Sequence, residues 1–128
     1  MLPPFVNEPA TDFSVLVHRE AYEAAIRDVR SRLGREWPVI IGGQRITTGS
    51  ELVSHNPSRH HEVVSRHASA RPADVDAAVT AATEAFTDWS RLPAVERATV
   101  IARAAQILRR RKHEFSAWMT LEVGKTWP

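Results

Sequence analysis

The amino-acid sequence predicts an α+β segment: an extended arm, an amphipathic helix, short β-hairpins and then two or three helices. Three patterns predict it. Apolar residues recur at steps of three and four in residues 20–33 and again after Pro72, β-prone runs flank Gly42-Gly43, and prolines crowd the first 14 residues. We therefore expect an arm over residues 1–14 and a folded portion over residues 15–128.

The composition is that of a soluble globular protein. Hydrophobic residues make up 43% and charged residues 25%, and no run approaches the roughly 18 consecutive apolar residues of a membrane span. The net charge of +2 argues only weakly for a polyanionic partner, and the first residues do not form a secretory signal. We expect a cytoplasmic protein with no nucleic-acid or membrane partner.

The first half contains one helical pattern and two pairs of β-prone runs. The helical face comprises Tyr22, Ala25, Ile26, Val29 and Leu33, and Gly34 stands where a left-handed cap would end the helix. Residues 37–41 and 44–47 flank Gly42-Gly43, which predicts a tight hairpin. Residues 52–55 and 62–68, on either side of Asn56-Pro57, predict a second pair of strands whose register the pattern does not fix.

The second half reads as helical from Pro72 to a predicted end at Gly124. Pro72 suits a first helical turn because its missing N–H would have no partner there. Leu92-Pro93 interrupts the pattern and starts the next helix. The apolar positions are Val75, Val79, Ala82, Phe86 and Trp89, then Val100, Ile101, Ala104, Ile107 and Leu108, and finally Phe115, Trp118, Met119 and Leu121.

No residue of this sequence can be assigned a catalytic, cofactor-binding or metal-binding role from a motif. There is no cysteine, which excludes thiol nucleophiles, thiolate metal sites and disulfides. Gly42-Gly43 lacks the third glycine and following helix of a dinucleotide loop. The histidines at positions 55, 60, 61 and 67 lack the spacing of zinc ligands, so we expect solvated loop and strand residues.

Residues 109–113 (RRRKH) form the only dense basic run. Five consecutive helical residues spread through more than one turn, and no aromatic residues are interleaved for stacking on a nucleic acid. We therefore favour a solvated helix segment or a salt-bridge face between subunits over a binding site for an anionic polymer.

Three stretches taken in order resemble the aldehyde dehydrogenase family. Residues 4–13 (PFVNEPATDF) resemble the opening of its glutamate γ-semialdehyde (1-pyrroline-5-carboxylate) branch. Residues 39–43 (VIIGG) with 54–57 (SHNP) resemble the family's early hairpin and Asn-Pro turn. Residues 75–89, 93–111 and 117–127 (AWMTLEVGKTW) resemble the helices that precede its nucleotide-binding core.

The resemblance implies an α/β family fold and NAD-dependent oxidation of an aldehyde to a carboxylate by a catalytic cysteine and a glutamate base. Those residues and the Rossmann core lie further on in the family, so residues 15–128 would be part of an NAD-binding domain that binds no NAD by itself. The expected partners are the rest of the dehydrogenase and neighbouring subunits of a homo-oligomer, which the arm would touch. Pro128 departs from the family, and a truncation, a frameshift and a fragment all remain open.

The resemblance also singles out two residues near which some relatives hold a monovalent cation. They correspond to Ser54 and Glu122. A carboxylate in the last turn of a helix opposes the helix dipole, and an ion would explain it, but a pair with Lys125 three residues on explains it more simply.

Two hypotheses for the function follow. The first is the amino-terminal segment of a glutamate γ-semialdehyde dehydrogenase of proline breakdown, inactive alone, with exposed apolar stripes that normally pack on the absent core. The second is a self-contained helical interaction module that uses residues 109–112 on an anionic partner.

Overall fold

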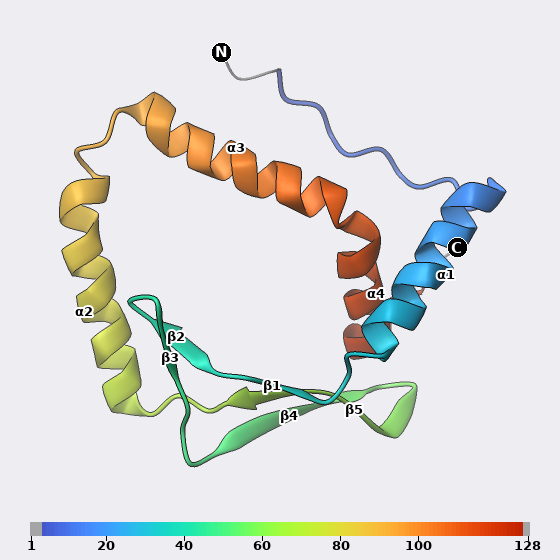
Figure 1. Ribbon diagram of the computed structural model, residues 1–128, viewed down its shortest axis with the longest axis horizontal. Coiled ribbons are helices and arrows are strands. Elements are labelled where there is room, and N and C mark those ends of the chain that lie inside the picture. Colours follow the sequence, from blue (N-terminus) through green and yellow to red (C-terminus); the bar gives the residue numbers. More distant parts are fainter. Residues whose placement is uncertain (1–3, 127–128) are drawn as a thin grey trace.

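The computed structural model describes residues 4–126, so residues 1–3 of the predicted arm and the Trp127-Pro128 pair lie outside the described residues. The elements are α1 (Leu16–Arg30), β1 (Arg35–Trp37), β2 (Val39–Ile41), β3 (Gln44–Ile46), β4 (Glu51–Asn56), β5 (Arg59–Ala68), α2 (Pro72–Trp89), α3 (Ala94–Arg110) and α4 (Lys112–Val123). Figure 1 shows an open frame with strands along its lower side, α2 at left, α3 across the top and α1 beside α4 at right. The predicted α+β class is confirmed.

The arm leads directly into α1. Residues 4–12 form neither helix nor strand, as predicted. The Asp12 carboxylate accepts hydrogen bonds from the Ser14 backbone N–H (2.9 Å) and hydroxyl (2.7 Å), which turns the chain before the helix begins. α1 therefore starts at Leu16, four residues before the predicted boundary, and ends at Arg30, with Gly34 at φ +75° in the turn beyond it.

The predicted hairpin over Gly42-Gly43 is confirmed. β2 and β3 pair antiparallel, and the two glycines have φ values of +54° and +79°, which suit the tight turn. The run that precedes the turn was predicted as one strand, but Pro38 divides it into β1 and β2, which belong to different sheets. Proline has no N–H to continue a ladder, so the pairing changes at this residue.

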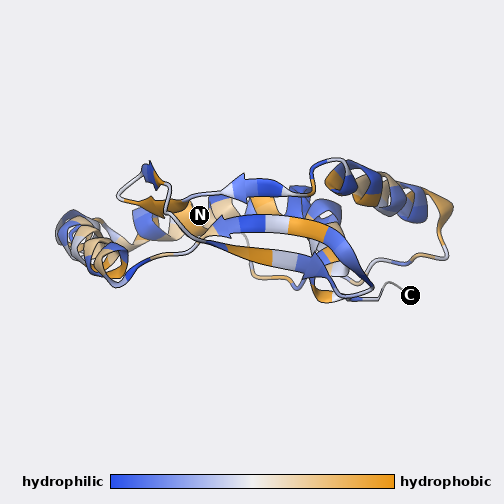
Figure 2. Ribbon diagram, turned by 90° about the horizontal axis from the view of Figure 1, so that it is seen from below, coloured by the Kyte–Doolittle hydropathy of each residue, from blue (hydrophilic) through white to orange (hydrophobic). Residues whose placement is uncertain are grey.

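The second predicted pair of strands is also confirmed. β4 and β5 pair antiparallel with Ser54 opposite Ser65, and the register shifts on either side of His55. The parallel pairing of β1 with the other edge of β5 was not predicted; it completes a three-stranded sheet in the order β1-β5-β4. Figure 2 shows short hydrophobic segments between longer hydrophilic ones along this sheet.

The stretch from Pro72 to Val123 forms three helices, within the predicted two or three. Pro72 begins α2, and Asp74 caps it by accepting hydrogen bonds from the Arg71 backbone N–H (2.8 Å) and from the Arg71 guanidinium (2.9 and 3.0 Å). α3 and α4 meet at Arg111, which ends one helix and caps the next. Gly124, at φ +69°, ends α4 as predicted.

The main core lies between α1 and α4. Tyr22 and Val29 of α1 are buried against Ala117 and Leu121 of α4. The Tyr22 hydroxyl is 2.6 Å from Thr120 Oγ1 and donates to the Ser116 carbonyl at 3.2 Å. The core therefore joins the first and last helices of the described chain, which Figure 1 shows side by side.

The end of α4 rests on the turn between β4 and β5. A Cβ atom at Gly124 would lie 3.1 Å from Pro57 Cγ, which is tighter than an ordinary contact, whereas one at Gly34 would meet nothing within 4 Å. Both glycines have positive φ. Gly124 is therefore required by its backbone conformation and by its neighbour together, and Gly34 by its backbone conformation alone.

We expect Tyr22→Phe to lower the free energy of unfolding by about 1–2 kcal/mol, because it removes a buried hydroxyl that Thr120 contacts. Urea denaturation measures the change. A double-mutant cycle with Thr120→Val isolates the pair, and strictly additive losses would contradict a direct hydroxyl bond.

We expect Gly124→Ala to destabilise the chain more than Gly34→Ala. The backbone strain costs about 1–2 kcal/mol at either site, and only Gly124→Ala also crowds Pro57. Thermal unfolding of the two variants compares them directly. Equal losses would show that the turn at Pro57 moves aside freely.

Candidate functional site

The residues with family-derived expectations gather where β4, the β4–β5 turn and α4 meet. Ser54 lies on β4, Glu122 lies in the last turn of α4, and both are half-buried. The two elements contact one another, and Gly124 closes on Pro57. Within residues 4–126, Glu122 forms no ion pair with Lys125, so the simpler explanation for this carboxylate is wrong. A cation between Ser54 and Glu122 stays a prediction.

Asn56 organises the turn at this junction. Its side chain is 3% exposed, its Oδ1 accepts the Ser58 backbone N–H at 2.9 Å, and its Nδ2 donates to Glu62 Oε2 at 2.5 Å. Glu62 also reaches Arg30 of α1, with 3.6 Å between Oε1 and Nε. Asn56 therefore has a structural task, since it satisfies a buried turn and links it to α1.

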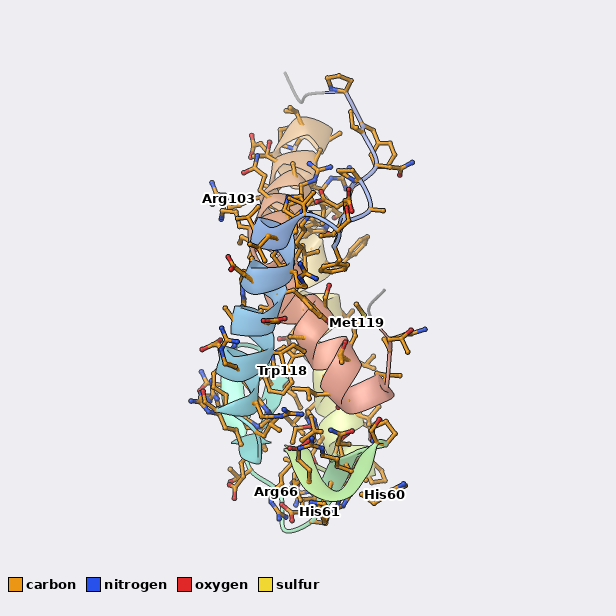
Figure 3. All side chains as sticks on the ribbon, turned by 90° about the vertical axis from the view of Figure 1, so that its right-hand side faces the viewer. His60, His61, Arg66, Arg103, Trp118 and Met119 are labelled. Atoms are coloured by element: carbon orange, nitrogen blue, oxygen red, sulfur yellow. The ribbon has the colours of Figure 1, made fainter. Side chains whose placement is uncertain are left out.

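A second polar network fixes the bend between α3 and α4. The Arg111 guanidinium donates to both oxygens of Glu114 (2.7 and 2.8 Å), and Arg32, in the turn after α1, donates to Glu114 Oε1 at 3.0 Å. Arg32 also lies over the Trp118 ring at 5.8 Å, and Figure 3 shows Trp118 between α1 and α4. The hydrogen bonds from Arg111, with help from Arg32, lower the pKa of Glu114 to about 2.

The basic run of residues 109–113 is largely paired within its own chain. Glu8 of the arm lies 3.3 Å from Arg109 Nε and 3.0 Å from Lys112 Nζ, and Arg109 also donates to the Val6 carbonyl at 2.9 Å. The hydrogen bond from Lys112 is the largest cause of a lowered pKa at Glu8. Within the described chain the carboxylate of the arm pairs with both side chains, and Arg109 stays 51% exposed. A salt-bridge face between subunits stays a prediction.

The four histidines of the first half do not converge. His55 Nδ1 donates to the His60 carbonyl at 2.9 Å, and His67 Nε2 is 2.8 Å from the Ser65 hydroxyl. Figure 3 shows His60 and His61 at one end of the molecule, near the β4–β5 turn. Across the described part of the chain, no three His, Cys, Asp or Glu side chains are grouped as metal ligands.

A cavity of about 340 Å³ lies between the arm and α4. Its walls are Ala10, Thr11, Phe13, Tyr22, His113, Ser116, Met119, Thr120, Lys125 and Thr126. Burial lowers the pKa of His113, and this lining contains no carboxylate to orient its ring. The cavity therefore cannot assemble a Ser–His–carboxylate triad.

The geometry of Gly42-Gly43 is that of a hairpin turn. The pair joins two antiparallel strands, and a Cβ at Gly42 would lie 3.8 Å from Ala81 of α2. A phosphate cradle needs a glycine loop that opens a helix with free N–H groups, whereas the first turn of α2 carries the carboxylate of Asp74. These residues do not fit a dinucleotide. None of the described helices is both long and apolar enough to cross a bilayer.

The Glu114 network has a predicted pH signature. The pKa of Glu114 falls from 4.5 to about 2 on folding, so its stabilisation is complete above pH 4.5 and is lost as the pH falls toward 2. We expect Glu114→Gln to cost about 1–3 kcal/mol near neutral pH and much less near pH 2. Urea denaturation across this range tests it, with Glu20→Gln on the exposed face of α1 as the control. A Glu114→Gln penalty that does not change with pH would contradict the network.

The sequence model of the aldehyde dehydrogenase family matches residues 44–128. Over 127 residues the chain is 48% identical to 1-pyrroline-5-carboxylate dehydrogenase of Geobacillus kaustophilus (strain HTA426), which covers 99% of this chain and 25% of the relative. It is 46% identical, with the same coverage, to 1-pyrroline-5-carboxylate dehydrogenase 2 of Halalkalibacterium halodurans. The chain thus spans about a quarter of the length of these curated relatives.

Solved structures agree with the sequence relatives. The fold matches 1-pyrroline-5-carboxylate dehydrogenase from Thermus with bound NAD at a TM-score of 0.95 and 41% identity, over 98% of this chain and 24% of that one. It matches the Mycobacterium tuberculosis Delta-pyrroline-5-carboxylate dehydrogenase at 0.85 and 30% identity, over 94% and 23%. The resemblance predicted from the sequence is confirmed, because these relatives are 1-pyrroline-5-carboxylate dehydrogenases of the aldehyde dehydrogenase family. The chain belongs to the aldehyde dehydrogenase family.

Proposed function

We propose that this chain is the amino-terminal segment of an NAD-dependent dehydrogenase that oxidises glutamate γ-semialdehyde to glutamate in proline breakdown. The observation that carries the proposal is the 48% identity over 127 residues to a 1-pyrroline-5-carboxylate dehydrogenase. In this proposal residues 15–128 are part of the NAD-binding domain, and the Rossmann core and the catalytic residues belong to the other three-quarters of such an enzyme. The complete enzyme would be a cytoplasmic homo-oligomer.

We also propose that the segment is inactive alone and binds no NAD by itself. The sequence contains no cysteine, so it lacks the nucleophile that the family chemistry requires. The proposal that the segment binds no NAD is supported by two features. Gly42-Gly43 closes a hairpin and does not open a helix, and the first turn of α2 is negatively charged. The segment's role in this proposal is structural, because its helices and strands form a frame that positions other parts of the enzyme.

The alternative of a self-contained module that binds an anionic partner has less support. Three of the four basic residues of its proposed contact, Arg109, Arg111 and Lys112, pair with Glu8 or Glu114 of the same chain. An anionic polymer would have to displace the carboxylates of Glu8 and Glu114 from these side chains. The contacts that it would gain are weakened by salt.

An activity assay tests the proposal. The purified 128-residue chain with NAD and glutamate semialdehyde should form no NADH above the blank, while the intact Geobacillus kaustophilus relative, assayed in parallel, should form it readily. NADH production that scales with the amount of chain would overturn the proposed inactivity. Titration calorimetry with NAD should show no binding, and a heat of binding that saturates with NAD would contradict the proposal that the segment binds no NAD by itself.

A further inference from the structure

The arm and α4 face one another across a cavity of about 340 Å³. Ala10, Thr11 and Phe13 form the arm wall of this cavity. The opposite wall consists of residues of α4 and of the stretch that follows Gly124, and Tyr22 of α1 also lines the cavity. Pockets for small molecules have volumes of roughly 300–1,000 Å³. The cavity therefore has room for a small organic molecule.

The arm wall is held in place at both of its ends. Before it, Glu8 lies 3.0 Å from Lys112 Nζ and 3.3 Å from Arg109 Nε. At its other end, the Asp12 carbonyl accepts a hydrogen bond from His18 Nδ1 at 3.0 Å. A wall that is ordered before a ligand arrives lowers the entropy cost of binding.

The charged groups along this cavity favour an anion. Lys125 and His113 line it, and no carboxylate does. Within the described chain, the Lys125 ammonium forms no ion pair. The acidic side chains of the arm are engaged elsewhere, since Glu8 pairs with the basic run and Asp12 accepts hydrogen bonds from Ser14. A negatively charged ligand would therefore meet the Lys125 ammonium and no carboxylate in this lining.

The surroundings of His113 also favour an anion. Burial is the largest cause of a lowered pKa at His113, and the electrostatic effects of Lys112 and His18 lower it further. These two neighbours oppose another positive charge on the ring. The same two neighbours would stabilise a negative charge placed beside it.

Hydroxyl groups and apolar side chains complete the lining. Thr11, Ser116 and Thr126 carry hydroxyls that can donate hydrogen bonds to the oxygen atoms of an anion. Phe13 and Met119 present apolar surface, and a methionine side chain adapts its shape to what it contacts. The lining thus combines donors for a carboxylate with apolar surface for a hydrophobic body.

We propose that this cavity binds a small organic carboxylate that has a hydrophobic body. The ammonium of Lys125 and the hydroxyl of Ser116 hold the carboxylate, and Phe13 and Met119 contact the body. An inorganic anion would leave the apolar surface uncovered, and a neutral apolar molecule would leave Lys125 without a counter-ion. The site rests on the lining of this cavity and does not depend on the proposed dehydrogenase activity.

Benzoate is the probe, because it joins a carboxylate to a flat apolar ring. The 128-residue chain contains two methionines, Met1 and Met119, so ¹³C labelling of the methionine methyl groups gives two NMR signals. Met119→Leu identifies the signal of Met119. We expect benzoate to shift this signal until the shift saturates. A chain in which benzoate causes no saturable shift of the Met119 signal overturns the proposal.

Two analogues separate the two parts of the ligand. Benzamide keeps the ring and lacks the charge, whereas acetate keeps the carboxylate and lacks the ring. Each should bind at least about tenfold more weakly than benzoate. Benzamide that binds as tightly as benzoate would show an apolar cavity without anion recognition. Acetate that binds as tightly would show that the apolar surface does not contribute, and either result overturns the proposal.

Lys125→Gln tests the cation. It should weaken benzoate binding by about fivefold or more, because it removes a charge-assisted hydrogen bond. Arg110→Gln is the matched control, since it removes the same charge from an exposed position of α3. The control should change the affinity by less than about twofold. Equal losses would show that the net charge of the chain attracts benzoate, which contradicts a site at Lys125.

Glu8→Gln tests the arm wall. It removes a negative charge, so a general electrostatic attraction predicts tighter binding of benzoate. Loss of the Glu8 ion pairs instead releases the arm wall, so the proposed site predicts binding that is weaker by about threefold or more. Far-UV circular dichroism verifies that the variant keeps its helix content. Tighter or unchanged binding by the folded variant would overturn the site.

Discussion

The packing of α1 against α4 is the contact on which the rest of the frame depends. Its central bond joins Tyr22 to Thr120, which are 98 positions apart in the sequence. Everything between them, from β1 to α3, is one long loop closed by this contact, and such a loop costs only slightly more to close than a shorter one. The burial of Val29 and Leu121 offsets that cost, and the hydroxyl bond fixes how the two helices meet.

The closed side of the frame (α1, α4 and the three-stranded sheet) and its open side (α2 and α3) are stabilised by different interactions. α1, α4 and the three-stranded sheet bury apolar side chains and bond polar ones, whereas α2 and α3 depend on their own backbone ladders. They have the length for it, because helices longer than roughly 12–15 residues gain enough hydrogen bonds to offset nucleation. The alanines of α2 add helix propensity without any tertiary contact.

Local patterns predicted the elements of this chain well, and distant pairings poorly. Gly42-Gly43, Pro72 and Gly124 each impose a backbone requirement that can be read from a few neighbouring residues, and each stands where it was predicted. The parallel pairing of β1 with β5 and the pairing of Glu8 with Arg109 bring together segments far apart in sequence, and neither residue type nor spacing identifies the partner. The exposed stripes were predicted from periodicity, because an apolar face is a local property while its partner is not.

Buried hydrogen bonds fix the geometry where elements of the frame join. Three of the buried residues in the described part of the chain are polar, namely Asn56, Ser65 and Asp74, and each forms a hydrogen bond within a turn, a strand or a helix cap. Hydrogen bonds are directional, so a few of them fix angles that apolar burial alone would leave loose. These bonds therefore fix the β4–β5 turn, strand β5 and the start of α2, whereas the apolar faces of α2 and α3 remain exposed.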